Sequence, residues 1–156
     1  MRMIYMSLIF SHINYCNLIW GSAHKTTLEP LFRLQKKSIC LVNNSHFLEH
    51  TAPIFNSLKI LTLHQVFKNN CLIFIYRCIK ENKFLNFSNR FLKNSDFHHH
   101  NTRNNEHYRL PKGRLRIFRN AYFVQGLTLW NSLDLNITNC NNIKNFKMNI
   151  KKMCFI

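Results

Sequence analysis

The stretch Thr62–Lys80, TLHQVFKNNCLIFIYRCIK, decides whether the middle of the chain is helical or extended. Its first residues, Thr62 and Gln65, have the spacing of a capping box, in which each side chain bonds the backbone N–H of the other residue. The segment Cys71–Ile79 is apolar at nearly every position, and such a run fits a buried strand as well as a buried helix. Because this run continues from the capped segment without a break, we predict a single helix from Thr62 to about Lys80.

Upstream of this stretch, the chain is apolar almost without interruption from Met3 to Trp20, except at Ser11-His12. We predict two helical pieces that join at Ser11-His12 and are buried on most sides. Gly21 follows the second piece, at a position where glycine commonly ends a helix.

The next helix is predicted to begin at Thr27 as its N-cap, with Glu29 in the first turn and Pro30 at the third position. A capping box from Thr26 to Glu29 is the alternative, but it moves Pro30 to a position where an N–H is needed. The apolar face would consist of Leu28, Leu31, Leu34 or Gln35, Ser38, and Leu41 or Val42. Three basic residues gather on the opposite side, Arg33, Lys36 and Lys37. The pattern indicates an amphipathic helix with a basic back.

Two further helices are predicted from similar signals. Thr51 would cap a short helix with Pro53 in its first turn. Near the C-terminus, Asn139 or Asn141 would cap an amphipathic helix. Its inward residues would be Ile143, Phe146 and Ile150, and its outward residues Lys144, Lys147 and Lys151.

These elements predict a mainly α protein, an irregular helical bundle with one polar basic loop. Residues 108–118 alternate weakly around a proline and a glycine, so one short β-hairpin is an option there. Composition indicates three regions: helices over residues 1–96, the basic loop or short strands over residues 97–119, and a helical tail over residues 120–156 that packs on the first region.

The chain is strongly basic, with 22 Lys and Arg against 6 Asp and Glu, a net charge of +16 and an isoelectric point near 10.0. A surface of this charge repels itself and needs polyanions to offset the field. Nucleic-acid phosphates are the common partner, because basic residues that neutralise them release counterions. With 156 residues, of which 46% are hydrophobic, the chain can bury a modest core, which argues against a disordered basic tail.

The 6 cysteines include no C-x-x-C pair, and no secretory segment accompanies them. We therefore expect free thiols in a reducing compartment and an intracellular protein, nuclear or cytoplasmic, that is not secreted. The apolar N-terminal run is broken by His12, Asn14 and Asn17, so no membrane span is expected. The partners that we expect include neither a membrane nor a small-molecule substrate.

The sequence lacks the patterns of a catalytic or metal site. A two-metal polymerase site needs clustered carboxylates, whereas no two acidic residues here lie within four positions of each other. His98-His99-His100 and His107 lack the spacing and thiolate partners of a zinc site, so a solvated polar loop is the better interpretation. We expect no catalytic residue, no metal and no cofactor in this chain.

Basic residues concentrate between Arg103 and Arg119, together with a single acid, Glu106, and two aromatic residues, Tyr108 and Phe118. The basic residues are Arg103, Arg109, Lys112, Arg114, Arg116 and Arg119. Arginine binds phosphate bidentately and aromatic rings stack on bases, so this stretch is the candidate nucleic-acid site. The alternative is a solvated basic loop that binds nothing in particular. Trp20 and Trp130, by contrast, sit in apolar runs and are predicted to pack in the core.

Five short sequence words are spread along the chain in a fixed order. They are Asn14-Tyr15-Cys16-Asn17-Leu18-Ile19-Trp20-Gly21, Leu34-Gln35-Lys36-Lys37, His50-Thr51-Ala52-Pro53-Ile54-Phe55, Asn101-Thr102-Arg103 and Leu129-Trp130-Asn131-Ser132-Leu133. In this order and spacing they resemble the C-terminal part of reverse transcriptases from jockey-like non-LTR retrotransposons, over roughly Ile4 to Met153. The family generally continues the last word with proline, where this chain has Asp134.

The resemblance implies a helical, thumb-like region and a tail that follow a polymerase palm. In that family the carboxylate motifs of the palm lie upstream of the first word, so we expect a truncated polymerase fragment without a catalytic residue. Its partners would be RNA or DNA and the upstream polymerase domain. The family's thumb and tail are implied to grip the template and primer duplex, and that grip falls here on Lys36, Lys37 and the Arg103–Arg119 stretch.

Two other functions stay open at this point. One is a self-standing small basic protein that binds RNA or DNA, and the other is an interaction module whose charge comes from codon usage. The DNA upstream of Met1 would distinguish the first of these from a polymerase fragment, because only the fragment would be preceded by a polymerase sequence.

Overall fold

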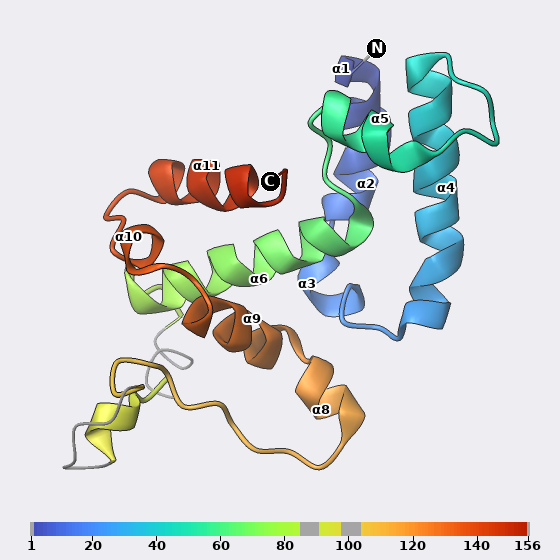
Figure 1. Cartoon of the computed structure of the whole chain (residues 1–156). Coiled ribbons are helices and arrows are strands. Elements are labelled where there is room, and N and C mark those ends of the chain that lie inside the picture. The colour runs from blue at the N-terminus through green and yellow to red at the C-terminus, as the bar shows by residue number, and fades with distance from the viewer. Residues whose placement is uncertain (1, 85–90, 98–103, 156) are drawn as a thin grey trace. The chain divides into compact units, whose positions relative to one another are not determined.

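The computed structural model describes residues 2–84, 91–97 and 104–155, and these residues form a helical bundle without β-strands (Figure 1). The prediction of a mainly α fold is confirmed. By its contacts the chain divides into two compact units. Unit 1 consists of Met1–Phe67 and Lys151–Ile156, and unit 2 consists of Lys68–Ile150. These boundaries follow contacts, whereas the three regions predicted above follow composition and stay a prediction.

Unit 1 begins with helical segments that run on from one another: α1 (Arg2–Tyr5), the π-helical turn η1 (Met6–Phe10) and α2 (Ser11–Asn14). The helix breaks at Cys16, whose backbone is left-handed with φ of 47°, and α3 (Asn17–Trp20) follows. Left-handed backbone stops an α-helix, so the turn that separates the two helical pieces lies here.

The predicted join at Ser11-His12 is therefore wrong. The Ser11 hydroxyl donates a hydrogen bond to the Ser7 carbonyl at 2.6 Å, so this serine is accommodated inside the helix. The predicted burial is also wrong for part of the segment. Tyr5 and Ile13 are buried, but Met3 is 84% exposed and Leu8 64% exposed.

Gly21 follows the last residue of α3, as predicted, but its backbone is not left-handed, with φ of −67°. A Cβ atom at this position would lie 2.5 Å from the Phe67 ring. Glycine is needed here because the Phe67 ring and the Asn17 carbonyl leave no room for a side chain, and not for its conformational freedom.

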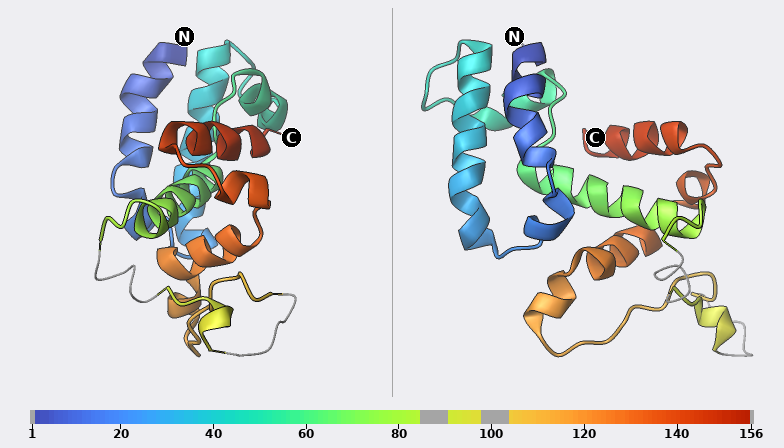
Figure 2. Two further views of the ribbon diagram at one scale, coloured as in Figure 1. Left: turned by 90° about the vertical axis from the view of Figure 1, so that its left-hand side faces the viewer. Right: turned by 180° about the vertical axis from the view of Figure 1, so that it is seen from behind.

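The helix α4 (Lys25–Asn43) runs alongside α1 and α2 (Figure 2). Both predicted caps are wrong, because His24 is the N-cap and its Nδ1 accepts from Thr26 N at 3.4 Å. Pro30 consequently lies inside the helix rather than in its first turn. An imidazole nitrogen can accept this hydrogen bond as a hydroxyl does, which the preference for Ser, Thr, Asp and Asn does not anticipate.

The sequence left either Leu34 or Gln35 as an inward residue of α4. In the structure Gln35 faces inward and Leu34 is exposed. Gln35 is buried, and its Nε2 donates to the Tyr5 hydroxyl at 2.8 Å and to the Leu61 carbonyl at 3.0 Å. Its Oε1 accepts from Leu63 N at 2.8 Å. The amide thus connects α1, α4 and the start of α6 through hydrogen bonds that leave neither of its ends unpaired.

Unit 1 also contains α5 (Thr51–Ser57) and the first residues of α6 (Leu63–Ile79), a helix that continues into unit 2. α5 has His50 as its N-cap, so Thr51 is its first helical residue and not the predicted cap. α6 has the predicted capping box, with Thr62 N donating to Gln65 Oε1 at 2.9 Å and Gln65 N to Thr62 Oγ1 at 3.4 Å. The helix predicted from the opening stretch is confirmed to within a residue at each end.

The core of unit 2 combines three buried aromatic residues with Leu72, Ile75, Leu127 and Ile150. Tyr76 on α6 stacks on Phe146 of α11 (Ile143–Met153), with ring centroids 4.5 Å apart. Trp130 of α9 (Tyr122–Asn131) lies 5.7 Å from the Phe146 ring and is buried, as predicted. Trp20 in unit 1 is half-buried and packs against that unit's core. Large rings bury a large apolar area for each residue, so these contacts help to stabilise a small core.

The rest of unit 2 is irregular. It contains the 3-10 turn η2 (Asn94–Asp96) and two short helices, α8 (Arg116–Asn120) and α10 (Leu135–Thr138). The optional hairpin at residues 108–118 does not form, because α8 occupies the second half of it and Tyr108 pairs instead with Lys93 in an isolated antiparallel bridge. Phe118 contacts Phe123 with ring centroids 5.6 Å apart, a contact that favours the helix over a strand.

The C-terminal helix α11 places Phe146 and Ile150 inward and leaves Lys144 and Lys147 exposed, as predicted, while Ile143 and Lys151 are half-buried. Its cap is Asn142, whose Oδ1 accepts from Lys144 N at 2.8 Å, and not Asn139 or Asn141. Within the described ranges, no helix is both long and apolar enough to cross a membrane.

Candidate nucleic-acid interface

The predicted binding residues lie in both units. Lys36 and Lys37 belong to α4 in unit 1. Those in unit 2 are Arg109, Lys112, Arg114, Arg116 and Arg119, whereas Arg103 and the His98-His99-His100 run lie outside the described residues. Each unit therefore carries its own candidate surface.

In unit 2, Arg109 and Lys112 border an open pocket of about 400 Å³. Its other lining residues are Asn94, Phe97, Asn104, His107, Tyr108, Leu110 and Asn131. The guanidinium carbon of Arg109 lies 4.3 Å from the centroid of the Phe97 ring, close enough for the ring face to attract the cation. This contact holds the Arg109 side chain in one place while leaving its N–H groups available.

Backbone pairing with a distant segment positions Arg109. Its N–H donates to the Leu92 carbonyl at 2.9 Å. Beside this bond, Lys93 Nζ donates to Glu106 at 2.6 Å, and this hydrogen bond raises the pKa of Lys93. Glu106, the only acid of the basic stretch, is thereby engaged by a lysine outside the stretch, and it leaves the arginines uncompensated.

Asn131 holds the same segment from the other side. Its Oδ1 accepts from Tyr108 N at 3.0 Å, and its Nδ2 donates to the Tyr108 carbonyl at 2.8 Å. The two bonds fix the backbone of the residue just before Arg109. Because Trp130 next to it is buried in the core, the Trp130-Asn131 pair connects the core of unit 2 directly to the basic loop.

The remaining three arginines lie on or near α8. Arg116 and Arg119 are on this helix, Arg114 precedes it, and all three are exposed. The basic stretch is therefore divided between an ordered pocket and an exposed short helix, and it is not one uniform loop.

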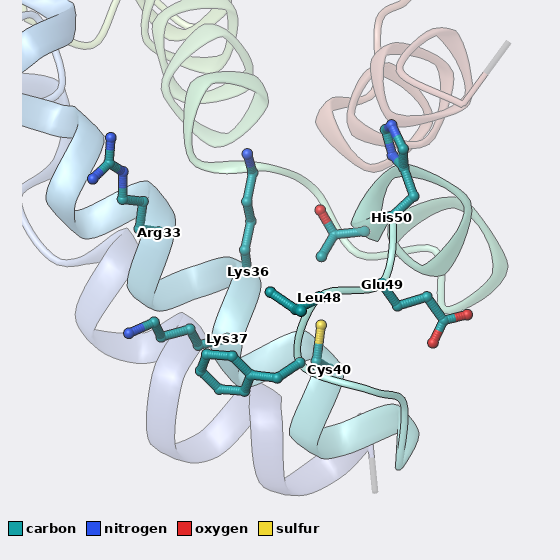
Figure 3. Close-up of a pocket in the computed structure, with 9 residues that line it drawn as sticks. Arg33, Lys36, Lys37, Cys40, Leu48, Glu49 and His50 are labelled. Carbon is teal, nitrogen blue, oxygen red and sulfur yellow. The ribbon is translucent and has the colours of Figure 1, made fainter.

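In unit 1, Lys36 and Lys37 line a second open pocket, of about 410 Å³, between α4 and the segment that leads into α5 (Figure 3). The full lining is Arg33, Lys36, Lys37, Cys40, Phe47, Leu48, Glu49, His50 and Thr51. Lys36 Nζ lies 4.4 Å from the centroid of the Phe32 ring, and Lys37 Nζ lies 5.2 Å from that of Phe47.

Few cations are neutralised within the chain. Among the described residues only three ion pairs occur, Glu29 with Arg33, Glu81 with Lys83, and Glu106 with Lys93. None of them involves any of the seven described candidate cations. All seven are at least partly exposed, so their charge is available to a polyanion.

The residues that contact or position these cations were not predicted from the sequence. Phe47 and Phe97 gave no signal, because a single phenylalanine in a polar segment is not distinctive. Asn131 was part of a sequence word, but its partner Tyr108 lies 23 positions away and cannot be inferred from spacing.

In the described part of the chain, no three His, Cys, Asp or Glu side chains lie close enough together to hold a metal ion. The cysteines are all free thiols. Burial raises the pKa of Cys71 to about 12 and that of Cys78 to about 11, so both are protonated and unreactive at neutral pH.

No protein-family model, no curated protein and no solved structure matches this chain. The functional interpretation therefore rests on the residues themselves and on the sequence words that they form.

Proposed function

We propose that the chain is the thumb-and-tail region of a jockey-like non-LTR retrotransposon reverse transcriptase, and that it binds the phosphate backbone of RNA or DNA without catalysing polymerisation itself. The observation that supports binding most strongly is the charge balance. Seven exposed or half-exposed candidate cations have no ion pair with a carboxylate among the described residues.

The chemistry of these residues fits backbone contact rather than sequence readout. Arginine and lysine bind phosphate oxygens, which carry no sequence information directly. The protein should therefore bind many sequences with similar affinity, and each neutralised phosphate should add roughly 0.7 to 0.9 to the slope of log affinity against log salt.

The absence of catalysis is part of the proposal. A polymerase needs two metal ions held by neighbouring carboxylates. Asp96 and Glu106 both bond to Lys93, because Lys93 N donates to Asp96 at 2.9 Å and Lys93 Nζ to Glu106 at 2.6 Å. These carboxylates hold the basic loop together and have no third acid beside them in the described residues.

The exposed apolar side chains at the start of unit 1 support the second expected partner. Met3, Ile4 and Leu8 are exposed, and Leu8 also borders a pocket of about 220 Å³ next to Leu34 of α4. Exposed apolar side chains offer a surface on which another domain can pack. In the proposed function this surface contacts the polymerase domain.

The first experiment measures binding and activity of the purified chain together. Binding to a short RNA–DNA duplex, followed by fluorescence anisotropy, should weaken steeply between 50 and 200 mM salt, roughly tenfold or more if at least two phosphates are neutralised. The same protein with primer–template, nucleotides and Mg²⁺ or Mn²⁺ should extend no primer. Salt-independent binding, or metal-dependent extension that is lost when an acidic residue is replaced, would overturn the proposal.

A second experiment tests the family itself. The genomic DNA that flanks the coding sequence should contain, in frame or frameshifted, the Tyr-x-Asp-Asp word of a reverse transcriptase. Flanking DNA with unrelated genes on both sides would favour a self-standing nucleic-acid-binding protein instead.

A further inference from the structure

The pocket beside α4 combines two kinds of side chain that occur together in sites for unpaired nucleotides. Three cations, Arg33, Lys36 and Lys37, extend from neighbouring turns of α4 (Figure 3). Apolar side chains from the following segment border them, and Phe47 is 54% exposed. A volume of about 410 Å³ is within the range of small-ligand sites.

The cations of this pocket are free to engage phosphate. Lys36 and Lys37 have no carboxylate partner among the described residues, and Arg33 has only an exposed i,i+4 contact with Glu29 at 3.3 Å. Such an exposed pair contributes little and can open at small cost. Glu49 also lines the pocket, but its carboxylate points away from the lysines (Figure 3).

The aromatic ring lies directly beside one of these cations. Lys37 Nζ is 5.2 Å from the centroid of the Phe47 ring. Neighbouring side chains thus offer an ammonium for a phosphate and a ring on which a base can stack. Buried Cys40 lines the pocket from α4, so the pocket rests on the core of unit 1.

We infer that this pocket binds an unpaired nucleotide of single-stranded RNA or DNA, with the phosphate on Lys36 and Lys37 and the base stacked on Phe47. In a duplex the base faces are covered by their neighbours, so a ring can stack on a base only where the strand is single. The inference rests on the proposed function and deepens it, because it assigns single-strand binding to unit 1.

The test is the substitution Phe47→Leu, which removes the ring but keeps an apolar side chain. Anisotropy titrations at one salt concentration would use a 12-nucleotide single strand and a blunt duplex of the same sequence. Affinity for the single strand should fall at least about fivefold, the lower end of what base–aromatic stacking contributes. Affinity for the duplex should stay within about twofold, because no phosphate contact is lost.

Two further variants make the result specific. Tyr15→Leu is the matched control, since Tyr15 is an exposed aromatic residue of the same unit that lines no part of this pocket. It should leave both affinities unchanged. Phe47→Trp should keep single-strand affinity, because the larger ring still stacks. Circular dichroism of each variant checks that the helices are intact.

The outcomes separate this inference from the proposed function. Single-strand affinity that is unchanged in Phe47→Leu, or equally reduced in Tyr15→Leu, overturns the inference while wild-type duplex binding still upholds the proposed function. A wild-type chain that binds neither nucleic acid overturns both. A selective single-strand loss in Phe47→Leu supports both.

Discussion

The two basic pockets are built in opposite ways. In unit 1 the cations Arg33, Lys36 and Lys37 come from one regular helix, and the residue that anchors this helix is Gln35, which lies between them in the sequence. In unit 2 the cations come from an irregular segment, and its anchors are Leu92 and Asn131, more than a dozen positions away. The first surface follows from local sequence, whereas the second exists only where distant segments meet.

This difference predicts which substitutions disrupt the structure of each pocket. A helix keeps its cations on one face for as long as it stays helical, so the unit 1 pocket should survive local damage and be lost only when the unit unfolds. The unit 2 pocket should be lost when a single hydrogen-bonded contact to the loop is removed, while its core remains intact.

The largest effect is expected from Gln35→Ala. The substitution leaves Leu63 N and the Leu61 carbonyl without their partner in a buried site, and it opens a cavity, so unit 1 should lose about 2–5 kcal/mol. Hydrogen exchange measured by mass spectrometry should show faster exchange across α4 and α1. The control is Ser38→Ala, one turn away. The Ser38 hydroxyl only donates a hydrogen bond to the Leu34 carbonyl of the same helix. Equal effects of both substitutions would contradict the role of Gln35.

A smaller effect is expected from Asn131→Ala. It removes both hydrogen bonds to Tyr108, which should cost about 1–3 kcal/mol locally and release residues 104–110. Exchange should accelerate in that loop but not in the peptides that contain Tyr76 and Phe146. Asn136→Ala, an exposed asparagine of α10, should change neither. If Asn131→Ala instead loosened the whole of unit 2, the asparagine would be a core residue and not a loop anchor.

The smallest of these effects depends on pH. It is expected in unit 2 alone, because Cys71 and Cys78 both lie there. Burial raises the pKa of Cys71 to about 12 and of Cys78 to about 11 in the folded protein. Unfolding exposes these thiols, which then ionise near pH 9, so the unfolded state releases protons that the folded state keeps. The contribution of the two thiols to the free energy of unfolding is therefore fully present below pH 9 and declines above it. Between pH 9 and pH 10 the two thiols together should cost about 1–2 kcal/mol.

Urea unfolding of a Trp20→Phe variant would measure this decline, because Trp130 then reports on unit 2 alone. The unfolding midpoint should be lower at pH 10 than at pH 8, and Cys78→Ala should reduce the difference. A midpoint that stays constant over this range would mean that the two thiols are not shielded from solvent.

Local signals in the sequence were sufficient for the regular helices. The capping box of Thr62 and Gln65 and the inward face of α11 follow from spacing alone, and both are confirmed. The predicted N-caps were wrong where a neighbouring polar residue could also accept the capping hydrogen bond. His24 caps α4 in place of Thr27 or Thr26, and Asn142 caps α11 in place of Asn139 or Asn141. Neighbouring polar residues compete for a cap, and the sequence alone does not rank them.

The candidate site was less predictable than the fold. The basic residues themselves are visible in the sequence, but their grouping is not. Arg109 joins Phe97 and Asn131 only because the loop pairs with Leu92, a contact that no periodic pattern encodes. Asp134 shows the converse case. Its φ of −63° lies at the value that proline imposes, although the residue is not a proline.

The central claim is that the basic stretch of unit 2 is a nucleic-acid site and not merely a share of the net charge. The most direct test compares two triple variants of equal charge in salt titrations on one short duplex. One replaces Arg109, Arg114 and Arg116 with Ala, and the other replaces three lysines of α11, the exposed Lys144 and Lys147 and the half-buried Lys151. The account predicts that the arginine variant weakens binding for every sequence and flattens the salt slope by about 2 to 3, while the lysine variant does less. Equal losses in the two variants would contradict it, since net charge alone would then explain the binding.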